Sequence, residues 1–424
     1  MNRALAETII RLFRDTGEDA PATLRACNLR TWNQTLNWLD ASGMALYFAQ
    51  HVRGHGLENA LPPEITARLQ TNLADNARRT SQLFDEFARI NQAFQNLCLA
   101  YAVVKGFALV PDYCPEPSLR YQLDFDFLVH RRDSSALAGV MDELGYELAS
   151  DAGTVWHFKK GEHRLPRISQ LYEPRPQLAV ELHFVDQPDP QTAVDVRPPT
   201  FLHVKTARLN DVEFPVLADV DAFVGQATHL FKHMRSEWTR ASWVLEFRRF
   251  LVGRAHDRGF WHAVNRRTAA NEGARLAIAA AIAVADVTFG PVPHNAASAI
   301  FAASDRVRCW IDLYWRDILL SNFPGSKLYL LLERELTDPQ EWKQLSRSRL
   351  YPLHRTPRVV HVEKSNSRPL GAVVTQMRFA IFRMRFHLVE GLRYWRESRR
   401  WKRSVADIKQ RVDLCAQIAR EVVH

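Results

Sequence analysis

The sequence predicts an α+β fold, in which a small mixed β-sheet is flanked by N-terminal and C-terminal helical regions. Three observations support this class. Apolar residues recur at helical spacing in the first hundred residues, short strand-like runs fill residues 101 to about 217, and helical spacing returns from Asp219 onward. Strands that are grouped in one part of a chain, apart from its helices, favour an α+β arrangement. We therefore divide the chain into an N-terminal helical region (1–99), a sheet-bearing core (100–217), a helical region that completes it (218–290) and a helical, basic C-terminal region (291–424).

Composition limits the class of protein. The 424-residue chain, with 46% hydrophobic and 24% charged residues, is ordinary for a soluble globular protein of two or three domains. Its five cysteines lie far apart without a Cys-x-x-Cys pair, which disfavours a disulfide framework or a zinc ribbon. Glu7 and Arg11 lie where a signal peptide would need an apolar core, and no uncharged run reaches the roughly 18 residues of a membrane span. We expect a cytoplasmic protein with no transmembrane segment, and the net charge of +9 suits an anionic partner.

The first hundred residues predict helices over residues 4–13 and 36–52, and a longer helix over about 65–97 that follows Pro62-Pro63. Apolar residues of the long helix, from Leu69 to Phe94, recur on one face. Two interpretations are open for this region. We favour a packing layer for the sheet over a cap that recognises substrate.

Two carboxylates, Asp124 and Asp126, lie two residues apart in residues 120–129, a run that otherwise reads as a buried β-strand. Side chains alternate along a strand, so we expect both acids on one face and Phe125 and Phe127 on the other. Two anions buried side by side are costly unless a positive charge lies between them. Mg²⁺ is commonly held by one or two carboxylates together with substrate phosphates. The pair therefore predicts a metal site, although an Asp-x-Asp pair alone is a weak signal.

Two neighbouring segments strengthen that prediction. Residues 101–104 form a short apolar strand that leads directly into Lys105-Gly106 and an expected helix start, where backbone can approach a phosphate closely. Residues 178–184 form a second strand, in which Glu181 is a lone carboxylate and His183 shares its face. Glu181 can thus join the Asp-x-Asp pair across adjacent strands, and His183 either orients it or fills the strand end.

In combination, these motifs resemble a known family. Lys105-Gly106 before a helix, Arg120 four residues ahead of the Asp-x-Asp pair, Gly145-Tyr146 after the next helix and the late Glu-Leu-His strand are similar to the uncharacterised bacterial nucleotidyltransferase family. That family belongs to the DNA polymerase beta-type nucleotidyltransferase superfamily. The resemblance covers roughly residues 40 to 290 and implies a minimal nucleotidyltransferase core. One departure is that the usual Gly-Gly or Gly-Ser is Gly106-Phe107 here, so no hydroxyl is offered to the phosphates at that step.

The resemblance implies a reaction and a set of roles. A nucleoside monophosphate passes from a nucleoside triphosphate (NTP) to an acceptor hydroxyl, and pyrophosphate leaves. Asp124 and Asp126 hold two Mg²⁺ or Mn²⁺ ions, while Glu181 ligates the ion beside the acceptor and helps to take up its proton. Gly106 lets the backbone meet the triphosphate. We expect Asp124→Asn or Asp126→Asn to abolish transfer and to leave the fold intact or stabilised, because a repulsive pair of acids is relieved.

Two cations lie close to these acids in sequence. Lys105 and Arg120 are suited to the negative charge that develops on a leaving pyrophosphate. Ion pairing with the acid cluster explains them nearly as well. Both are therefore candidate nucleotide-binding residues, with a structural alternative.

The remaining elements follow in order. Strands are expected over 146–148, 155–158 and 168–172, and a hairpin over 204–217 turns at Asn210-Asp211. Helices are expected over 223–233, 243–252, 260–269 and 273–287. His229 and His233 share one face of the first of these helices, and we favour packing or substrate contact over zinc binding for this pair. In the tail, an apolar stripe from Met377 to Trp395 lies among many arginines. Such a helix can bind nucleic acid or an anionic membrane, although a solvated face opposite a core is commoner.

Two further functions remain open alongside nucleotidyl transfer. A glycosyltransferase also uses an Asp-x-Asp metal site, but it normally has an α/β nucleotide-binding half before that motif, and the preceding segment here is helical with one short strand. A non-catalytic interaction protein that keeps the fold is favoured by the altered glycine step and the basic tail. The sequence does not specify the acceptor, which can be a small molecule, a protein or a nucleic acid.

Overall fold

The computed structural model describes residues 1–14, 20–161, 170–174, 177–185, 203–292, 296–350 and 369–423. It confirms the α+β class, with a mixed sheet and helical flanks. The chain divides into two compact units, the first made of Met1–Leu230 and Arg240–Phe301 and the second of Phe231–Thr239 and Ala302–His424. The four-part division made from the sequence stays a prediction.

The described strands form one seven-stranded sheet in the first unit. Its β1–β7 and β2–β5 pairs are parallel, and its other pairs are antiparallel. The predicted hairpin is present as β6 and β7. The order across the sheet is β3 (Glu147–Asp151), β4 (Val155–Lys160), β5 (Leu178–Phe184), β2 (Phe125–Val129), β1 (Tyr101–Val104), β7 (Val212–Leu217) and β6 (Val204–Leu209).

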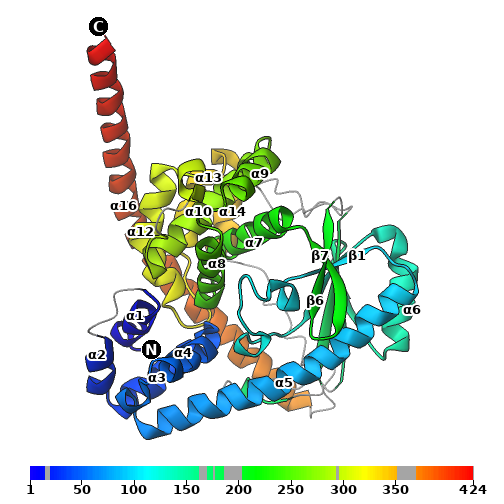
Figure 1. The fold of residues 1–424 in the computed structure, drawn as a ribbon. Helices are drawn as coiled ribbons and strands as arrows, with labels where there is room; N and C mark the ends of the chain where they lie inside the picture. The colour runs from blue at the N-terminus through cyan, green and yellow to red at the C-terminus, as the bar shows by residue number, and fades with distance from the viewer. Residues whose placement is uncertain are drawn as a thin grey trace. The chain divides into compact units, whose positions relative to one another are not determined.

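One face of the sheet is covered by a buried aromatic core. Helix α5 (Pro63–Asn96) begins with a proline at its first turn and runs along the sheet, near α6 (Ser134–Glu143) (Figure 1). Its Phe87 and Phe94 pack against Phe125 and Phe127 of β2. The predicted alternation is therefore confirmed for these phenylalanines, which point away from Asp126. The role of α5 in packing is also as expected.

The opposite face carries a smaller apolar patch, formed by Ala102, Leu128 and Leu217. Ala222 of α7 (Asp219–Met234) packs against this patch, so α7 covers part of the sheet. His229, about two helical turns further along α7, packs edge-on against Trp243, with ring centroids 5.1 Å apart. This face is the one that also carries the charged residues described below.

The other helices of the first unit bury further apolar side chains. Trp32, Trp38 and Phe48 are fully buried among the N-terminal helices, and α10 is buried along most of its length. These helices are α1 (Arg3–Leu12), α2 (Ala20–Ala26), α3 (Leu29–Ala41), α4 (Met44–Gly54), α8 (Ala241–Gly253), α9 (Arg258–Thr268), α10 (Glu272–Phe289) and α11 (Ala296–Ile300). None of the described helices is long and apolar enough to cross a membrane.

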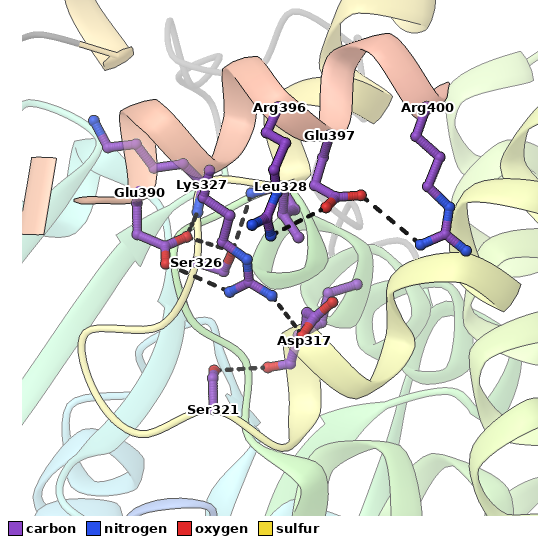
Figure 2. Close-up of polar contacts among 11 residues, drawn as sticks. Asp317, Ser321, Ser326, Lys327, Leu328, Glu390, Arg396, Glu397 and Arg400 are labelled. Atoms are coloured by element: carbon purple, nitrogen blue, oxygen red, sulfur yellow. Dashed lines mark hydrogen bonds and ion pairs between the residues drawn. The ribbon is translucent and has the colours of Figure 1, made fainter. Parts of the chain in front are cut away.

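The second unit is helical, with α12 (Asp305–Leu319), α13 (Tyr329–Leu336), α14 (Pro339–Leu350) and α16 (Pro369–Val423). One side of α16 is fixed by buried polar contacts (Figure 2). Glu390 accepts hydrogen bonds from the Ser326 hydroxyl at 2.7 Å and from the Lys327 backbone at 3.1 Å, and Arg393 pairs with Asp317 at 2.6 Å. These contacts determine which face of α16 points inward.

Three predictions outside the acidic cluster differ from the structure. The helix expected over 36–52 is divided into α3 and α4, because Gly43 between them has a φ of 74°. The strand expected over 168–172 lies partly outside the described residues, and Gln170–Tyr172 forms a turn instead. The helix expected after Gly106 is a single 3-10 turn, η2 (Gly106–Leu109). Pro111 explains the short turn, because proline restricts Val110 and cannot continue a helix.

Candidate active site

The register of three strands brings acidic and basic side chains together. Asp126 on β2 is the register partner of Glu181 on the parallel strand β5, and Leu128 is the partner of His183. On the other side of β5, His157 of the antiparallel strand β4 lies opposite Glu181. Alternation then puts Asp126, Glu181 and His183 on the face opposite the aromatic core. One carboxylate oxygen or ring nitrogen from each of these three lies within 4.8 Å of the others.

The cluster is held by close polar contacts. Asp126 is buried, and one oxygen, Oδ1, contacts Lys105 Nζ at 2.5 Å and His183 Nε2 at 2.9 Å. Glu181 contacts His157 Nδ1 at 3.0 Å and His183 Nε2 at 3.3 Å. His183 thus bridges the two carboxylates, and its position beside Glu181 is that expected from the sequence.

The opposite charges in the cluster shift the pKa values of Asp126, Glu181 and His183. Burial acts to raise the pKa of Asp126, but the Lys105 charge and the hydrogen bond with His183 outweigh it and hold that pKa below its usual range. Burial likewise opposes ionisation of Glu181, and hydrogen bonds from His157 and His183 lower its pKa strongly. In return, the two carboxylates raise the pKa of His183 against the effect of its burial. Both acids are therefore ionised at neutral pH.

Asp124 lies just before β2 rather than within it, which corrects the expected strand over 120–129. The Gln122 side chain donates to the Asp124 carbonyl at 2.8 Å, and Arg79 donates to the Gln122 carbonyl at 2.7 Å. Side chains therefore occupy the backbone carbonyls that would accept hydrogen bonds from a neighbouring strand if β2 began earlier. Among the described residues, Asp124 is not part of the group within 4.8 Å. The charges of Asp126 and Glu181 nevertheless act on Asp124. Burial, and then repulsion from these two carboxylates, raises the pKa of Asp124 to about 6.

Lys105 and Gly106 form a strained step at the end of β1. Lys105 has a φ of 59° and Gly106 a φ of 44°, both in the region that favours glycine. A Cβ at Gly106 would lie 2.6 Å from Gln122 Nε2. The step therefore needs glycine both for its φ and for the close approach of Gln122, and it directs Lys105 at Asp126.

Arg120 is separated from the cluster by a partner of its own. Its Nε lies 3.3 Å from Glu246 Oε1, and Tyr47 donates to the same carboxylate at 2.9 Å. Glu246 is buried, and the Arg120 side chain is only 16% exposed. The Arg120 charge still acts on Asp124, whose pKa it lowers against the larger effects of burial and repulsion.

Sequence reasoning missed three contributors to this region. Glu246 lies 126 residues from Arg120, and no sequence pattern connects them. Gln122 was not among the expected site residues, although it lies between Arg120 and Asp124, which both were. His157 had a usable signal, because it is a polar residue in an otherwise apolar strand beside the one that carries Glu181.

The residues present fit a hard divalent cation. Asp124, Asp126 and Glu181 offer carboxylate oxygens, the ligands that Mg²⁺ and Mn²⁺ prefer. The raised pKa of Asp124 reflects burial together with the negative charge of its two neighbours, a state that a cation would relieve. His183 adds a nitrogen ligand that is already engaged with both acids.

Comparison with known proteins assigns a family. No protein with a curated description matches the chain. Residues 28–290, more than half of the chain, match a family described as uncharacterised nucleotidyltransferase. The match includes all the strands of the sheet and every residue of the cluster. The chain therefore belongs to the uncharacterised nucleotidyltransferase family.

Proposed function

We propose that this protein is a metal-dependent nucleotidyltransferase, which moves a nucleoside monophosphate from an NTP to a hydroxyl group of an acceptor and releases pyrophosphate. One observation carries the proposal. Asp126 and Glu181 are register partners on one face of the sheet, and Lys105 Nζ lies 2.5 Å from Asp126. Family membership supports this class of reaction. We extend the proposal to the DNA polymerase beta-type superfamily, because the same acids follow its pattern of an Asp-x-Asp pair and a later acid.

The reaction exchanges one bond at phosphorus for another. The acceptor oxygen bonds to the α-phosphorus, the bond from that phosphorus to the bridging oxygen breaks, and pyrophosphate leaves with the electron pair. Mg²⁺ or Mn²⁺ held by Asp124, Asp126 and Glu181 would supply positive charge to the phosphates. His157 and His183 orient Glu181 and keep it ionised. Its low pKa makes Glu181 a weak base, so we assign it to ligation first and to proton uptake second.

The three candidate nucleotide-binding residues, Lys105, Gly106 and Arg120, have different roles in this proposal. Lys105 can exchange its contact with Asp126 for phosphate oxygens, because its side chain is partly exposed. Gly106 fixes the backbone that presents Lys105. Arg120 contributes positive potential rather than direct contact, since Glu246 holds its guanidinium.

Labelled transfer tests this proposal. Purified protein is incubated with Mg²⁺ or Mn²⁺, each α-labelled NTP in turn and a cell extract as the source of acceptor. We expect label on an acceptor with the wild type, none with EDTA, and none with Asp126→Asn or Glu181→Gln. Asp142→Asn is the matched control, because Asp142 is an exposed acid on α6. Transfer that survives Asp126→Asn contradicts the proposal.

A second function is favoured by one specific observation. Lys105, His157 and His183 already pair with Asp126 and Glu181, as a closed structural ion cluster would require. Under this alternative the protein is a non-catalytic interaction protein that keeps the fold. Isothermal titration with Mg²⁺ and each NTP separates the two, because a closed cluster binds neither. The glycosyltransferase alternative loses support, since β1 is the only described strand before Asp124.

We also propose an anionic lipid surface as the partner of α16. Phe386, Tyr394 and Trp401 are buried on one side of this helix. The opposite side carries a stripe of large apolar residues, each more than half exposed: Met377, Ile381, Met384, Leu388, Leu392 and Trp395. Arginines flank the stripe, whereas the two glutamates are already engaged, Glu390 with Ser326 and Glu397 with Arg400. Nucleic acid would neutralise the arginines but would leave the stripe uncovered, so a membrane surface fits better.

A further inference from the structure

A cavity of about 170 Å³ adjoins the acid cluster within the first unit. Lys105 and His183, whose nitrogens contact Asp126, form part of its wall. The rest of the wall is mainly apolar and includes Leu128 and Leu217 of the sheet. The cavity therefore connects the charged cluster with an apolar space under α7.

Helix α7 contributes two distinctive residues to this cavity. Gly225 lies in the helix interior, where glycine is unfavourable, and a Cβ built on it would meet no atom within 4 Å. No close packing therefore requires a glycine there, and its effect is to leave the cavity open. Gln226 also lines the cavity, and its side chain makes no hydrogen bond with any described residue. Its amide offers one acceptor and two donors to a ligand.

We propose that this cavity binds the nucleobase of the nucleotide substrate, and that Gln226 contacts the polar edge of the base. The inference rests on the proposed function and adds the location of the base. Lys105 connects the two, because the residue assigned to the phosphates also lines the cavity. A planar ring gains apolar contact with Leu128 and Leu217, while the amide reads its edge. The stacked rings of Tyr113 and Phe250, with centroids 4.6 Å apart, complete the wall.

An acceptor fits this cavity less well than a base does. A protein or nucleic-acid acceptor is too large for a space of 170 Å³. A purely aliphatic acceptor would bury the Gln226 amide without a hydrogen-bond partner, which is unfavourable. A nucleobase has both the apolar faces and the polar edge that the lining residues present.

Filling the cavity tests the proposal. Gly225→Leu places a side chain in the open space, and Gly139→Leu is the matched control, because Gly139 is an exposed helix glycine on α6 that also has no atom within 4 Å of a Cβ. Both changes replace glycine with a better helix former, so the fold is retained, as circular dichroism checks. Isothermal titration calorimetry in the presence of Mg²⁺ measures the affinity of each variant for ADP, GDP, CDP, UDP and inorganic pyrophosphate. Diphosphates cannot release pyrophosphate, so transfer does not interfere.

We expect Gly225→Leu to weaken the binding of nucleoside diphosphates by about tenfold or more, the factor that corresponds to 1.4 kcal/mol, and to leave pyrophosphate binding unchanged. Gly139→Leu changes neither affinity. Gln226→Ala changes the relative affinities for the four nucleoside diphosphates more than it changes their mean affinity, because it removes the group that contacts the edge of the base.

Three results would overturn the proposal. These are equal diphosphate affinities in Gly225→Leu and Gly139→Leu, an equal loss of pyrophosphate affinity in Gly225→Leu, and no binding of any diphosphate to the wild type. The outcome is separate from that of labelled transfer. A selective loss in Gly225→Leu together with no transfer by the wild type would reject the proposed function and retain the base-binding cavity.

Discussion

Replacing Asp124 and Asp126 with asparagine should change folding stability in opposite directions when no metal is present. The sequence alone suggested that either change is neutral or stabilising. The structure reverses that expectation for Asp126, whose charge is favoured by Lys105 and His183. It keeps the expectation for Asp124, whose charge is disfavoured by burial and by its acidic neighbours.

The magnitude for Asp124 follows from its pKa. The folded chain raises this pKa from 3.8 to about 6. A difference of about two pH units corresponds to about 3 kcal/mol at neutral pH, at 1.36 kcal/mol per unit. Asp124→Asn can therefore recover up to about 3 kcal/mol of stability. Asp126→Asn removes hydrogen bonds to charged groups and should cost about 2 kcal/mol.

The pH dependence has a definite sign. Because the folded pKa of Asp124 is raised, the folded state binds more protons than the unfolded state between pH 3.8 and about 6, and wild-type stability falls as pH rises through that window. The lowered pKa of Asp126 acts in the other direction, since its contribution is present above pH 3.8 and is lost as pH falls. The gain from Asp124→Asn should therefore be large at pH 7 and small near pH 4.

Calorimetric unfolding in EDTA at these two pH values measures the effect, with Asp142→Asn as an exposed-acid control. Three results would refute the reasoning. They are a loss of stability in Asp124→Asn at pH 7, the same gain at both pH values, and shifts of the same sign in Asp124→Asn and Asp126→Asn.

Three further predictions follow from single contacts. Gly106→Ala should destabilise the protein by about 1–3 kcal/mol, because of its positive φ and the 2.6 Å approach to Gln122; urea unfolding checks this, and an unchanged midpoint would contradict it. Lys105→Met should weaken pyrophosphate binding by about tenfold in titration calorimetry, the effect of about 1.4 kcal/mol, whereas equal affinity would remove Lys105 from the phosphate site. Met384→Glu with Leu388→Glu should abolish sedimentation with anionic vesicles, and wild-type binding that is equal on neutral vesicles would contradict an electrostatic contribution.

The parts of the site that strands hold could be predicted from the sequence. Alternation alone places Asp126 opposite Phe125 and Phe127, and the same rule puts Glu181 and His183 on one face of their strand. The predicted neighbours Asp126 and Glu181 are register partners in the structure. The sequence could not show that β2 and β5 are parallel neighbours, because pairing depends on the whole sheet.

The parts that loops hold could not be predicted. Asp124 lies one residue outside β2, where alternation no longer fixes its direction, and the turn after Gly106 is shorter than the helix that the pattern suggested. Arg120 was expected near the acids or the phosphates, but Glu246, far away in sequence, holds it. Long-range partners of this kind leave no local pattern.

The aromatic face of the sheet explains why the charged face has a definite geometry. A shift of β2 by one residue would expose Phe125 and Phe127 and bury Asp126 among the aromatic rings packed on α5. Each exposed phenylalanine would cost roughly 1.5–3 kcal/mol, and a buried unpaired carboxylate would cost more, so the register is fixed before any ligand binds. The aromatic core therefore positions Asp126 opposite Glu181, and Lys105 and the histidines then offset their charge. A pre-formed pair of carboxylates would need no rearrangement of the sheet to meet a cation, which is the condition that the metal-dependent transfer we propose requires.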